Sequence, residues 1–230
     1  MIFRQLFDRE SSTYTYLLAD KQSAEALVID PVIENVPQYQ QLINELGMKL
    51  VIAIDTHVHA DHISGAPRLS KSTRCAYAMG HETRAECISR RLRHKDIIQV
   101  GELELRALYT PGHTDDSYSF LMHDRVFTGD TLLIRGTGRT DFQNGDPGAQ
   151  YDSLFNTLLT LPEHTLVYPA HDYEGQTVST IGEEKRFNPR LQVSSREAYI
   201  DQMNSLKLDR PAKMDIAVPA NLNCKYTEVT

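Results

Sequence analysis

A dense group of metal-binding side chains at residues 57–62 is the feature that most limits what this chain can fold into. Three further candidates follow at wide spacing, each in its own turn-rich context. The seven candidate ligands are His57, His59, Asp61, His62, His113, Asp130 and His171. Five imidazoles and two carboxylates so far apart in sequence can form one site only in a fold that gathers distant loops, and this pattern indicates a buried metal centre.

Each candidate group directly follows a short apolar segment that is predicted to be a β-strand. These segments are residues 50–54, 103–109, 125–128 and 165–168. Loops at strand ends are where a sheet can direct side chains from distant positions to one point. The repeated arrangement therefore predicts a mixed α/β fold with a single site.

The remaining patterns alternate strands and helices. Strands are predicted at residues 13–18, 25–29 and 118–122, and helices at residues 36–46, before Gly47, and around residues 151–159. The segment 134–148 contains four glycines and a proline. Because it is long for a connection without secondary structure, we expect it to be functional or mobile, as one wall of a substrate pocket.

The spacing within the first group predicts how its side chains converge. In an extended stretch alternate residues face the same side, so His57, His59 and Asp61 can meet, while His62 needs a turn such as a helix start at Asp61. Neutral imidazole and carboxylate suit zinc, iron or manganese, so residue types leave the metal open. The other four histidines are interpreted as surface or hydrogen-bonded residues: His81, His94, His123 and His164.

Bulk composition limits domain number, partners and location. With 230 residues, 40% of them hydrophobic, we expect one domain over residues 1–230 with a short C-terminal extension from about residue 190. A net charge of -7 without a long Lys and Arg run argues against nucleic acid. No segment approaches the roughly 20 apolar residues of a membrane span, so we expect no membrane partner and a cytoplasmic location.

The three cysteines are odd in number and have no CxxC spacing. Cys75, Cys87 and Cys224 therefore predict neither a disulfide framework nor a zinc knuckle, and they suit a reducing cytoplasm. Cys224 is interpreted as an inert buried residue rather than a catalytic one.

The ligand pattern resembles the metallo-β-lactamase superfamily, whose fold is a four-layer αββα sandwich with two mixed sheets flanked by helices. Its members include zinc β-lactamases, glyoxalase II thioester hydrolases, RNA-processing nucleases and persulfide dioxygenases, so the ligands do not fix the reaction. Further segments are similar to the persulfide dioxygenase branch: residues 128–143, 168–173, 188–190 and 218–221. Only 59 residues follow His171 (230 minus 171), fewer than the helical domain of glyoxalase II proteins usually needs.

The resemblance implies an enzyme of sulfur metabolism that oxidises glutathione persulfide with O2 and water to sulfite and glutathione. It implies one Fe(II) per chain, held by His57, His113 and Asp130, with open positions for a persulfide sulfur and O2. The other four candidates would then orient ligands and exchange protons: His59, Asp61, His62 and His171.

Two alternatives stay open at this point. All seven ligands of a two-metal hydrolase are present, so the chain also fits a glyoxalase II-type hydrolase of S-acyl glutathione with two Zn, Fe or Mn ions. The second alternative is a non-catalytic metal- or thiol-binding module.

The resemblance also implies substrate-binding residues, because glutathione carries two carboxylates. Arg139 and Tyr173 are the matching candidates, although Arg139 could instead pin its loop to Asp141 or Asp130. Asp172 is either an acceptor for a ligand histidine or a loop cap.

Two positions depart from the family pattern. Asp116 stands where many relatives have glycine and Thr137 where some have cysteine, and both would alter the shape or charge of the site entrance. The chain has no room for a rhodanese-like domain, so a sulfurtransferase partner would be a separate protein. Family analogy is compatible with a homodimer.

Overall fold

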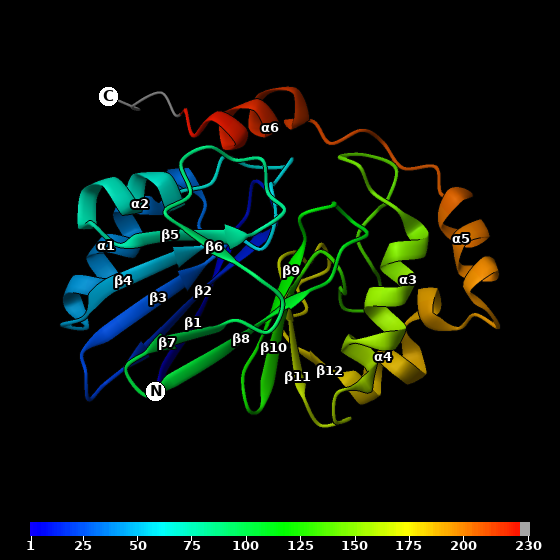
Figure 1. Cartoon of the computed structure of the whole chain (residues 1–230), viewed down its shortest axis with the longest axis horizontal. Coiled ribbons are helices and arrows are strands. Elements are labelled where there is room, and N and C mark those ends of the chain that lie inside the picture. Colours follow the sequence, from blue (N-terminus) through cyan, green and yellow to red (C-terminus); the bar gives the residue numbers. More distant parts are fainter. Residues whose placement is uncertain (226–230) are drawn as a thin grey trace. The chain divides into compact units, whose positions relative to one another are not determined.

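The computed structural model describes residues 1–225, which form two mixed β-sheets with associated helices (Figure 1). The first sheet has six strands in the order β1-β2-β3-β4-β5-β6. They are β1 (Ile2–Asp8), β2 (Thr13–Asp20), β3 (Glu25–Ile29), β4 (Lys49–Ile54), β5 (Ala76–Gly80) and β6 (Arg90–Leu92). β1, β2 and β3 pair antiparallel, whereas β3 to β6 pair parallel. The helices with this sheet are η1 (Ile33–Asn35), α1 (Val36–Glu45), α2 (Ala66–Thr73) and α6 (Met214–Asn223).

The second sheet has the order β12-β11-β10-β9-β8-β7. Its strands are β7 (Ile97–Val100), β8 (Leu103–Tyr109), β9 (Tyr118–Leu121), β10 (Arg125–Gly129), β11 (Leu166–Pro169) and β12 (Ser179–Thr180). β10 and β11 are parallel, and the pairs β8–β9, β9–β10 and β11–β12 are antiparallel. Its helices are α3 (Pro147–Asn156), η2 (Leu158–Thr160), α4 (Ile181–Phe187), η3 (Pro189–Leu191) and α5 (Arg196–Asn204).

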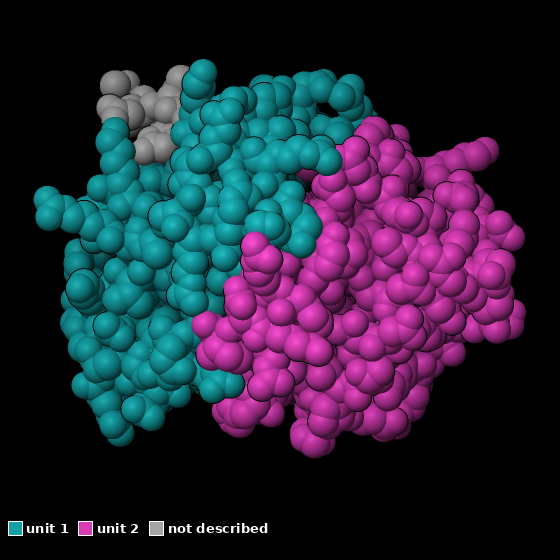
Figure 2. Space-filling model, viewed as in Figure 1, with its two compact units in different colours: residues 1–92, 98–104, 210–230 teal, residues 93–97, 105–209 magenta. Residues whose placement is uncertain are grey.

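The chain divides into two compact units, which are coloured separately in Figure 2. Unit 1 holds residues 1–92, 98–104 and the chain from residue 210 onward, and unit 2 holds residues 93–97 and 105–209. The predicted C-terminal extension is divided between them, because α5 lies in unit 2 and α6 in unit 1. Folding as a single domain stays a prediction.

Each unit has its own apolar core, which explains why its helices take their places. In unit 1 the apolar faces of α1 and α2 pack on the sheet through Tyr39, Ile43 and Leu69. In unit 2 α3 and α5 bury Leu154 and Tyr199 in a second cluster. Within residues 1–225, no helix is long and apolar enough to cross a bilayer.

The predicted relation between strands and candidate ligands is confirmed. β4 ends three residues before His57, β10 ends directly before Asp130, and β8 and β11 end shortly before His113 and His171. The strands predicted at residues 25–29 and 103–109 match β3 and β8. Of the strands and α-helices, sequence reasoning did not find β1, β5, β6, β7, β12, α2, α4, α5 or α6.

The predicted helix start at Asp61 is wrong, because α2 begins only at Ala66. Residues 57–64 contain no helix, and the reason is visible in their hydrogen bonds. The carbonyls of His59 and His62, which a helix would pair with amides four residues on, accept hydrogen bonds from the Asn221 side chain instead, at 2.9 and 3.0 Å.

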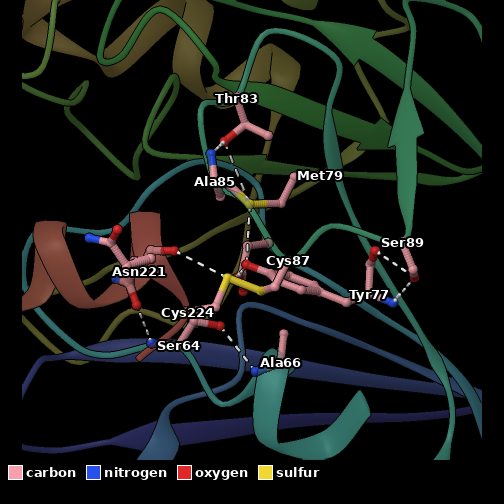
Figure 3. The surroundings of a disulfide bond; sticks show 12 residues. Ser64, Ala66, Tyr77, Met79, Thr83, Ala85, Cys87, Ser89, Asn221 and Cys224 are labelled. Atoms are coloured by element: carbon pink, nitrogen blue, oxygen red, sulfur yellow. Dashed lines mark hydrogen bonds between the residues drawn. A yellow bond between two sulfur atoms is a disulfide. The ribbon is translucent and has the colours of Figure 1, made fainter. Parts of the chain in front are cut away.

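The cysteine prediction is also wrong, since Cys87 and Cys224 form a disulfide and only Cys75 is a free buried thiol (Figure 3). The two bonded cysteines are 137 residues apart. Sequence spacing carries no signal for such a pair, because the contact arises only when α6 packs beside the connection between β5 and β6.

Candidate metal centre

The first ligand group lies on the loop after β4 and is organised by Asp30, a buried carboxylate at the end of β3. Asp30 accepts hydrogen bonds from the Thr56 amide (2.7 Å) and the Thr56 hydroxyl (3.0 Å). It also lies 3.1 Å from His59 Nε2. Because a carboxylate only accepts, His59 Nε2 carries the proton, and Nδ1 is left as the atom that is able to bind a metal.

The same chain of hydrogen bonds sets the tautomer of His57. Thr56 Oγ1 donates its proton to Asp30, so in its 2.9 Å contact with His57 Nδ1 the hydroxyl accepts. His57 Nε2 is thereby the atom that can bind a metal. The arrangement orients a ligand through its other nitrogen, as buried metal sites generally do.

His59, Asp61 and His62 form a second possible ligand group within unit 1. One donor atom from each lies within 4.8 Å of the others. Asp61 Oδ2 accepts from His62 Nδ1 at 2.8 Å and from Thr13 Oγ1 at 3.1 Å. The imidazoles of His57, His59 and His62 follow one another, with ring centroids 4.2 and 4.3 Å apart.

Unit 2 brings its own three predicted ligands together. His113 Nε2 lies 3.4 Å from Asp130 Oδ2, and His171 Nε2 lies 3.7 Å from Asp130 Oδ1. Both separations exceed the usual N–H···O distance. Two ligands of one metal, each bonded at about 2.0–2.2 Å, lie about 3 Å or more apart, so these distances suit a shared cation.

The tautomer of His113 decides between a hydrogen bond and a metal. Its Nδ1 lies 2.7 Å from the backbone carbonyl of Arg139, which can only accept, so Nδ1 carries the proton. In the neutral ring Nε2 is then an acceptor facing a carboxylate, which is also an acceptor. A divalent cation between them satisfies both, and the donor set of unit 2 therefore fits a metal.

Asp55, directly before the first ligand loop, is a buried acid with an altered pKa. Burial, and secondly the charge of Asp30, raise the pKa of Asp55 to about 7. The hydroxyl of Tyr77 donates to Asp55 Oδ2 at 2.8 Å. Near pH 7 this carboxyl is partly protonated in the protein without metal.

The glycine-rich loop 134–148 reaches its place through two fixed points. The buried carboxylate of Glu184 accepts from the Arg135 amide at 2.8 Å and also binds the Arg135 guanidinium. The Gly138 amide donates to the Asp130 carbonyl at 2.7 Å. A Cβ on Gly138 would lie 2.3 Å from that carbonyl and 2.8 Å from His113 Nδ1, so only glycine fits beside these candidate ligands.

Arg139 holds its own loop in place through Asp141, as the first of its two interpretations predicts. Its guanidinium binds Asp141 at 2.7 and 2.8 Å and donates to the carbonyls of Leu208 and Asp209. The bonds to Asp141 raise the pKa of Arg139. Its predicted contact with substrate stays a prediction.

The loop after β11 holds the other two predicted residues. Tyr173 is 73% exposed, and its ring stacks on His171, with centroids 6.1 Å apart. Asp172 Oδ2 accepts from the amides of Glu174 (2.9 Å) and Gln176 (2.6 Å). Asp172 therefore caps its loop, and Tyr173 lies beside the candidate ligand His171 with most of its surface exposed.

The matches with known proteins agree with this arrangement. The metallo-beta-lactamase superfamily profile matches residues 8–171. The mitochondrial persulfide dioxygenases ETHE1 of Mus musculus and Homo sapiens are 46% and 44% identical, each covering 97% of this chain and 89% of the relative. The crystal structure of ETHE1 from Myxococcus xanthus is 54% identical, has a TM-score of 0.95 and covers 97% of this chain and 99% of that chain.

The chain belongs to the persulfide dioxygenase branch of the metallo-β-lactamase superfamily. The predicted recognition and fold class are thus confirmed, with two mixed six-stranded sheets flanked by helices. The fold and the grouped histidines and carboxylates support a bound metal.

Sequence reasoning assigned no role to the positively charged side chain of Arg190, which lies in unit 2 after α4. Arg190 Nη1 donates to the Thr137 carbonyl (2.5 Å) and the Thr137 hydroxyl (3.2 Å). Burial lowers the pKa of Arg190, and among residues 1–225 no carboxylate is paired with it. The signal was available, since the segment 188–190 matched the family, but it named no role for the arginine.

The two departures from the family pattern are both buried. Asp116 accepts from the Thr114 hydroxyl at 2.7 Å. The Thr137 hydroxyl accepts from Arg190 and also lies 3.3 Å from the Tyr199 hydroxyl. Thr137 thus contacts the Arg190 guanidinium, while Asp116 belongs to the turn after His113.

Proposed function

We propose that this protein is a non-haem iron persulfide dioxygenase. It converts glutathione persulfide, O2 and water into sulfite, glutathione and two protons. The observation that carries the proposal is the His113–Asp130 pair, in which the Arg139 carbonyl fixes the imidazole so that Nε2 faces the carboxylate. The persulfide dioxygenase relatives, 46% identical in the mouse protein, support this chemistry.

His57, His113 and Asp130 would hold one ferrous ion per chain. Iron would supply the electron transfer with O2, which side chains do not perform. The protein orients two of these ligands from behind, His57 through Thr56 and His113 through a backbone carbonyl. Ligands that are fixed in this way need no rearrangement when the metal binds.

His59, Asp61, His62 and His171 would act beside the iron. His62 Nδ1 donates a 2.8 Å hydrogen bond to Asp61, and this pair can hold or pass a proton. Water attack on the oxidised sulfur and release of the glutathione thiol both need proton transfer. His59 and His62 are buried, while Asp61 is about one-quarter exposed.

The substrate carboxylates need cationic partners, and Arg190 fits this role best. Among residues 1–225 the guanidinium of Arg190 donates only to neutral groups of Thr137, whereas Arg139 is already bound to Asp141. A carboxylate reaching Arg190 would gain a charge-assisted hydrogen bond without displacing an acid. We keep Tyr173 as the aromatic contact and Arg139 as a loop-positioning residue with a secondary substrate role.

The test is oxygen uptake by iron-loaded protein on addition of glutathione persulfide. We expect uptake that depends on both iron and enzyme, with one sulfite formed per O2. His113→Ala should lose metal and activity together, while Arg139→Ala should keep its metal and bind substrate more weakly. Iron-loaded protein that consumes no O2, or a His113→Ala variant that keeps full activity, would refute the proposal.

One observation favours a second candidate, a two-metal hydrolase of S-acyl glutathione. His59, Asp61 and His62 offer donor atoms within 4.8 Å, which is a possible second metal site. This enzyme would bind about two zinc, iron or manganese ions and would hydrolyse thioesters without O2. Metal analysis together with both assays separates it from the dioxygenase and from a binding module, which would show neither activity.

Location and partners follow from the same proposal. We propose a cytoplasmic homodimer that receives its persulfide from a separate sulfurtransferase of the rhodanese type. The mouse and human relatives carry the description mitochondrial, so fractionation of cells that express the protein is the direct test of location.

A further inference from the structure

Three consecutive residues of unit 2, 137–139, contact two of the proposed iron ligands through their backbone. The Arg139 carbonyl accepts from His113 Nδ1 at 2.7 Å. The Gly138 amide donates to the Asp130 carbonyl, also at 2.7 Å. The direction of the His113 imidazole therefore depends on where this segment lies, and the contacts of the Gly138 carbonyl show what holds the segment.

Gln150, on α3, is a fully buried amide that binds this segment. Its Nε2 donates to the Gly138 carbonyl at 3.0 Å. Its Oε1 accepts from the hydroxyl of Tyr199, on α5, at 2.8 Å. Because a carbonyl only accepts, the amide can bind Gly138 only through its NH2 group, and its oxygen is left for a donor. Both ends of the amide are thus satisfied in a single orientation.

The hydroxyl of Tyr199 is held in place as a donor. Tyr199 is fully buried, and burial raises its pKa to about 12, because a phenolate is poorly stabilised away from water. The hydroxyl therefore keeps its proton near neutral pH. The ring packs against that of Tyr151, with centroids 5.7 Å apart. Tyr199 thus presents its proton to Gln150 from a fixed position and prevents the amide from turning its oxygen toward Gly138.

The backbone of Gln150 lies against the chain that leads into His113. Gly112, directly before His113, has a φ of +140°, and a Cβ at Gly112 would lie 2.3 Å from Gln150 Cα. Ser153 on the same helix donates to the Pro111 carbonyl at 2.7 Å. α3 therefore holds the backbone before His113, while the side chain of Gln150 holds the segment that binds the His113 ring.

We propose that Gln150 and Tyr199 are positioning residues for the metal ligand His113. Tyr199 orients the Gln150 amide, and Gln150 fixes the Gly138 carbonyl. The next carbonyl along the chain then directs His113 so that its Nε2 faces Asp130. The effect on catalysis rests on the proposed function, whereas the effects on the ring and on metal affinity do not.

Loss of the Gln150 amide should disturb the ligand through the backbone. The Gly138 carbonyl would lose a buried donor, and the segment 137–139 would shift toward another one, because an unpaired buried carbonyl is unfavourable. The acceptor of His113 moves with the segment. Substitutions behind metal ligands typically weaken metal binding by about 10- to 100-fold, and Gln150 does not touch the ring itself, so we expect about tenfold.

The test measures the His113 ring directly in zinc-loaded protein, because zinc is diamagnetic and suits NMR. Exchange of the His113 Nδ1 proton with water reports on its bond to the Arg139 carbonyl. Gln150→Met keeps the length of the side chain without an amide, and Tyr199→Phe removes only the hydroxyl. We expect the proton to exchange about tenfold faster in Gln150→Met, with a smaller increase in Tyr199→Phe. Competition with a chelator should show zinc bound about tenfold more weakly in Gln150→Met.

Gln192→Met is the matched control in unit 2. The Gln192 amide also binds backbone carbonyls, those of Lys185 at 2.9 Å and Asn188 at 3.2 Å, which lie outside the segment 137–139. This variant should keep the parent exchange rate and the parent zinc affinity. Losses in Gln192→Met equal to those in Gln150→Met would indicate a general loss of stability and would overturn the proposal.

Unchanged exchange and zinc affinity in folded Gln150→Met and Tyr199→Phe would also overturn it. If Gln150→Met does not fold, Tyr199→Phe decides alone, since it keeps the buried ring. Oxygen uptake with glutathione persulfide adds a third readout, in which iron-loaded Tyr199→Phe should lower kcat and leave KM close to that of the parent. A parent protein that consumes no O2 would refute the proposed function, while the NMR and zinc results would still decide the roles of Gln150 and Tyr199.

Discussion

Glu184 offers a sharp test of how unit 2 builds its ligand loop, because a single buried carboxylate fixes three segments. It is fully buried and accepts hydrogen bonds from the Arg135 amide (2.8 Å), Ser179 Oγ (2.5 Å) and Asn188 Nδ2 (2.9 Å). It also pairs with the Arg135 guanidinium. Glu184→Gln keeps the shape but removes the charge and points an NH2 group at donors.

The expected cost follows from these contacts. Removing one partner of a buried ion pair costs about 3–5 kcal/mol. Arg135 is one-third exposed and keeps a second partner, Glu183, so the loss should fall near the lower end, at about 3 kcal/mol. Urea unfolding measures it as a lower midpoint with an unchanged slope.

Glu183→Gln is the matched control, since this neighbour binds the same Arg135 at 2.9 Å but is about half exposed. An exposed pair is worth about 0–1 kcal/mol, so the control should remain close to the parent protein. Glu184→Gln should also weaken metal binding, because Arg135 lies three residues before Gly138, which packs beside His113. Equal unfolding midpoints for the two variants would refute this account.

Three further substitutions test the site. Gly138→Ala should displace His113 and lower metal content, whereas Gly136→Ala, where the nearest atom would be 3.8 Å away, should keep it; metal analysis of both folded proteins checks this. The pKa of Asp55 is raised to about 7 in the folded protein from 3.8, so the metal-free folded state holds a proton that the unfolded state loses between about pH 4 and 7. Its free energy of unfolding should fall as pH rises through that window, and Asp55→Asn should flatten this decline in urea titrations. Arg190→Ala should raise KM for glutathione persulfide by about tenfold with metal content unchanged, and Arg190→Lys should recover part of the loss in steady-state oxygen uptake.

The sequence contained enough to predict the strand-end ligands. Alternating and apolar runs located β3, β4, β8, β10 and β11, and each candidate ligand group follows one of the last four. These predictions succeeded because the pattern that marks a buried strand also marks where the strand stops. The elements that were missed have weaker patterns: β6 has three residues with one buried, and α6 mixes apolar residues with Asp215, Asn221 and Asn223 without forming one apolar face.

Asp30, Asn221 and the disulfide escaped the same reasoning for a different reason. Asp30 follows a predicted strand, as His57 does, but it belongs to no recognisable metal-ligand motif. Its role is visible only in its hydrogen bonds with Thr56 and His59. The roles of such residues depend on their contacts in the folded protein, and the sequence shows only their neighbours along the chain.

This difference bears on how the metal loop keeps its shape. Residues 57–64 carry four candidate ligands but form no helix, so their carbonyls and amides need partners from elsewhere. Asn221 supplies three of these bonds from a residue 157–162 positions away. A loop that is held from outside can present several imidazoles side by side, which a helix with 3.6 residues per turn could not do at positions 57, 59 and 62. The shape of the loop therefore depends on the position of α6, and the Cys87–Cys224 disulfide holds the end of that helix.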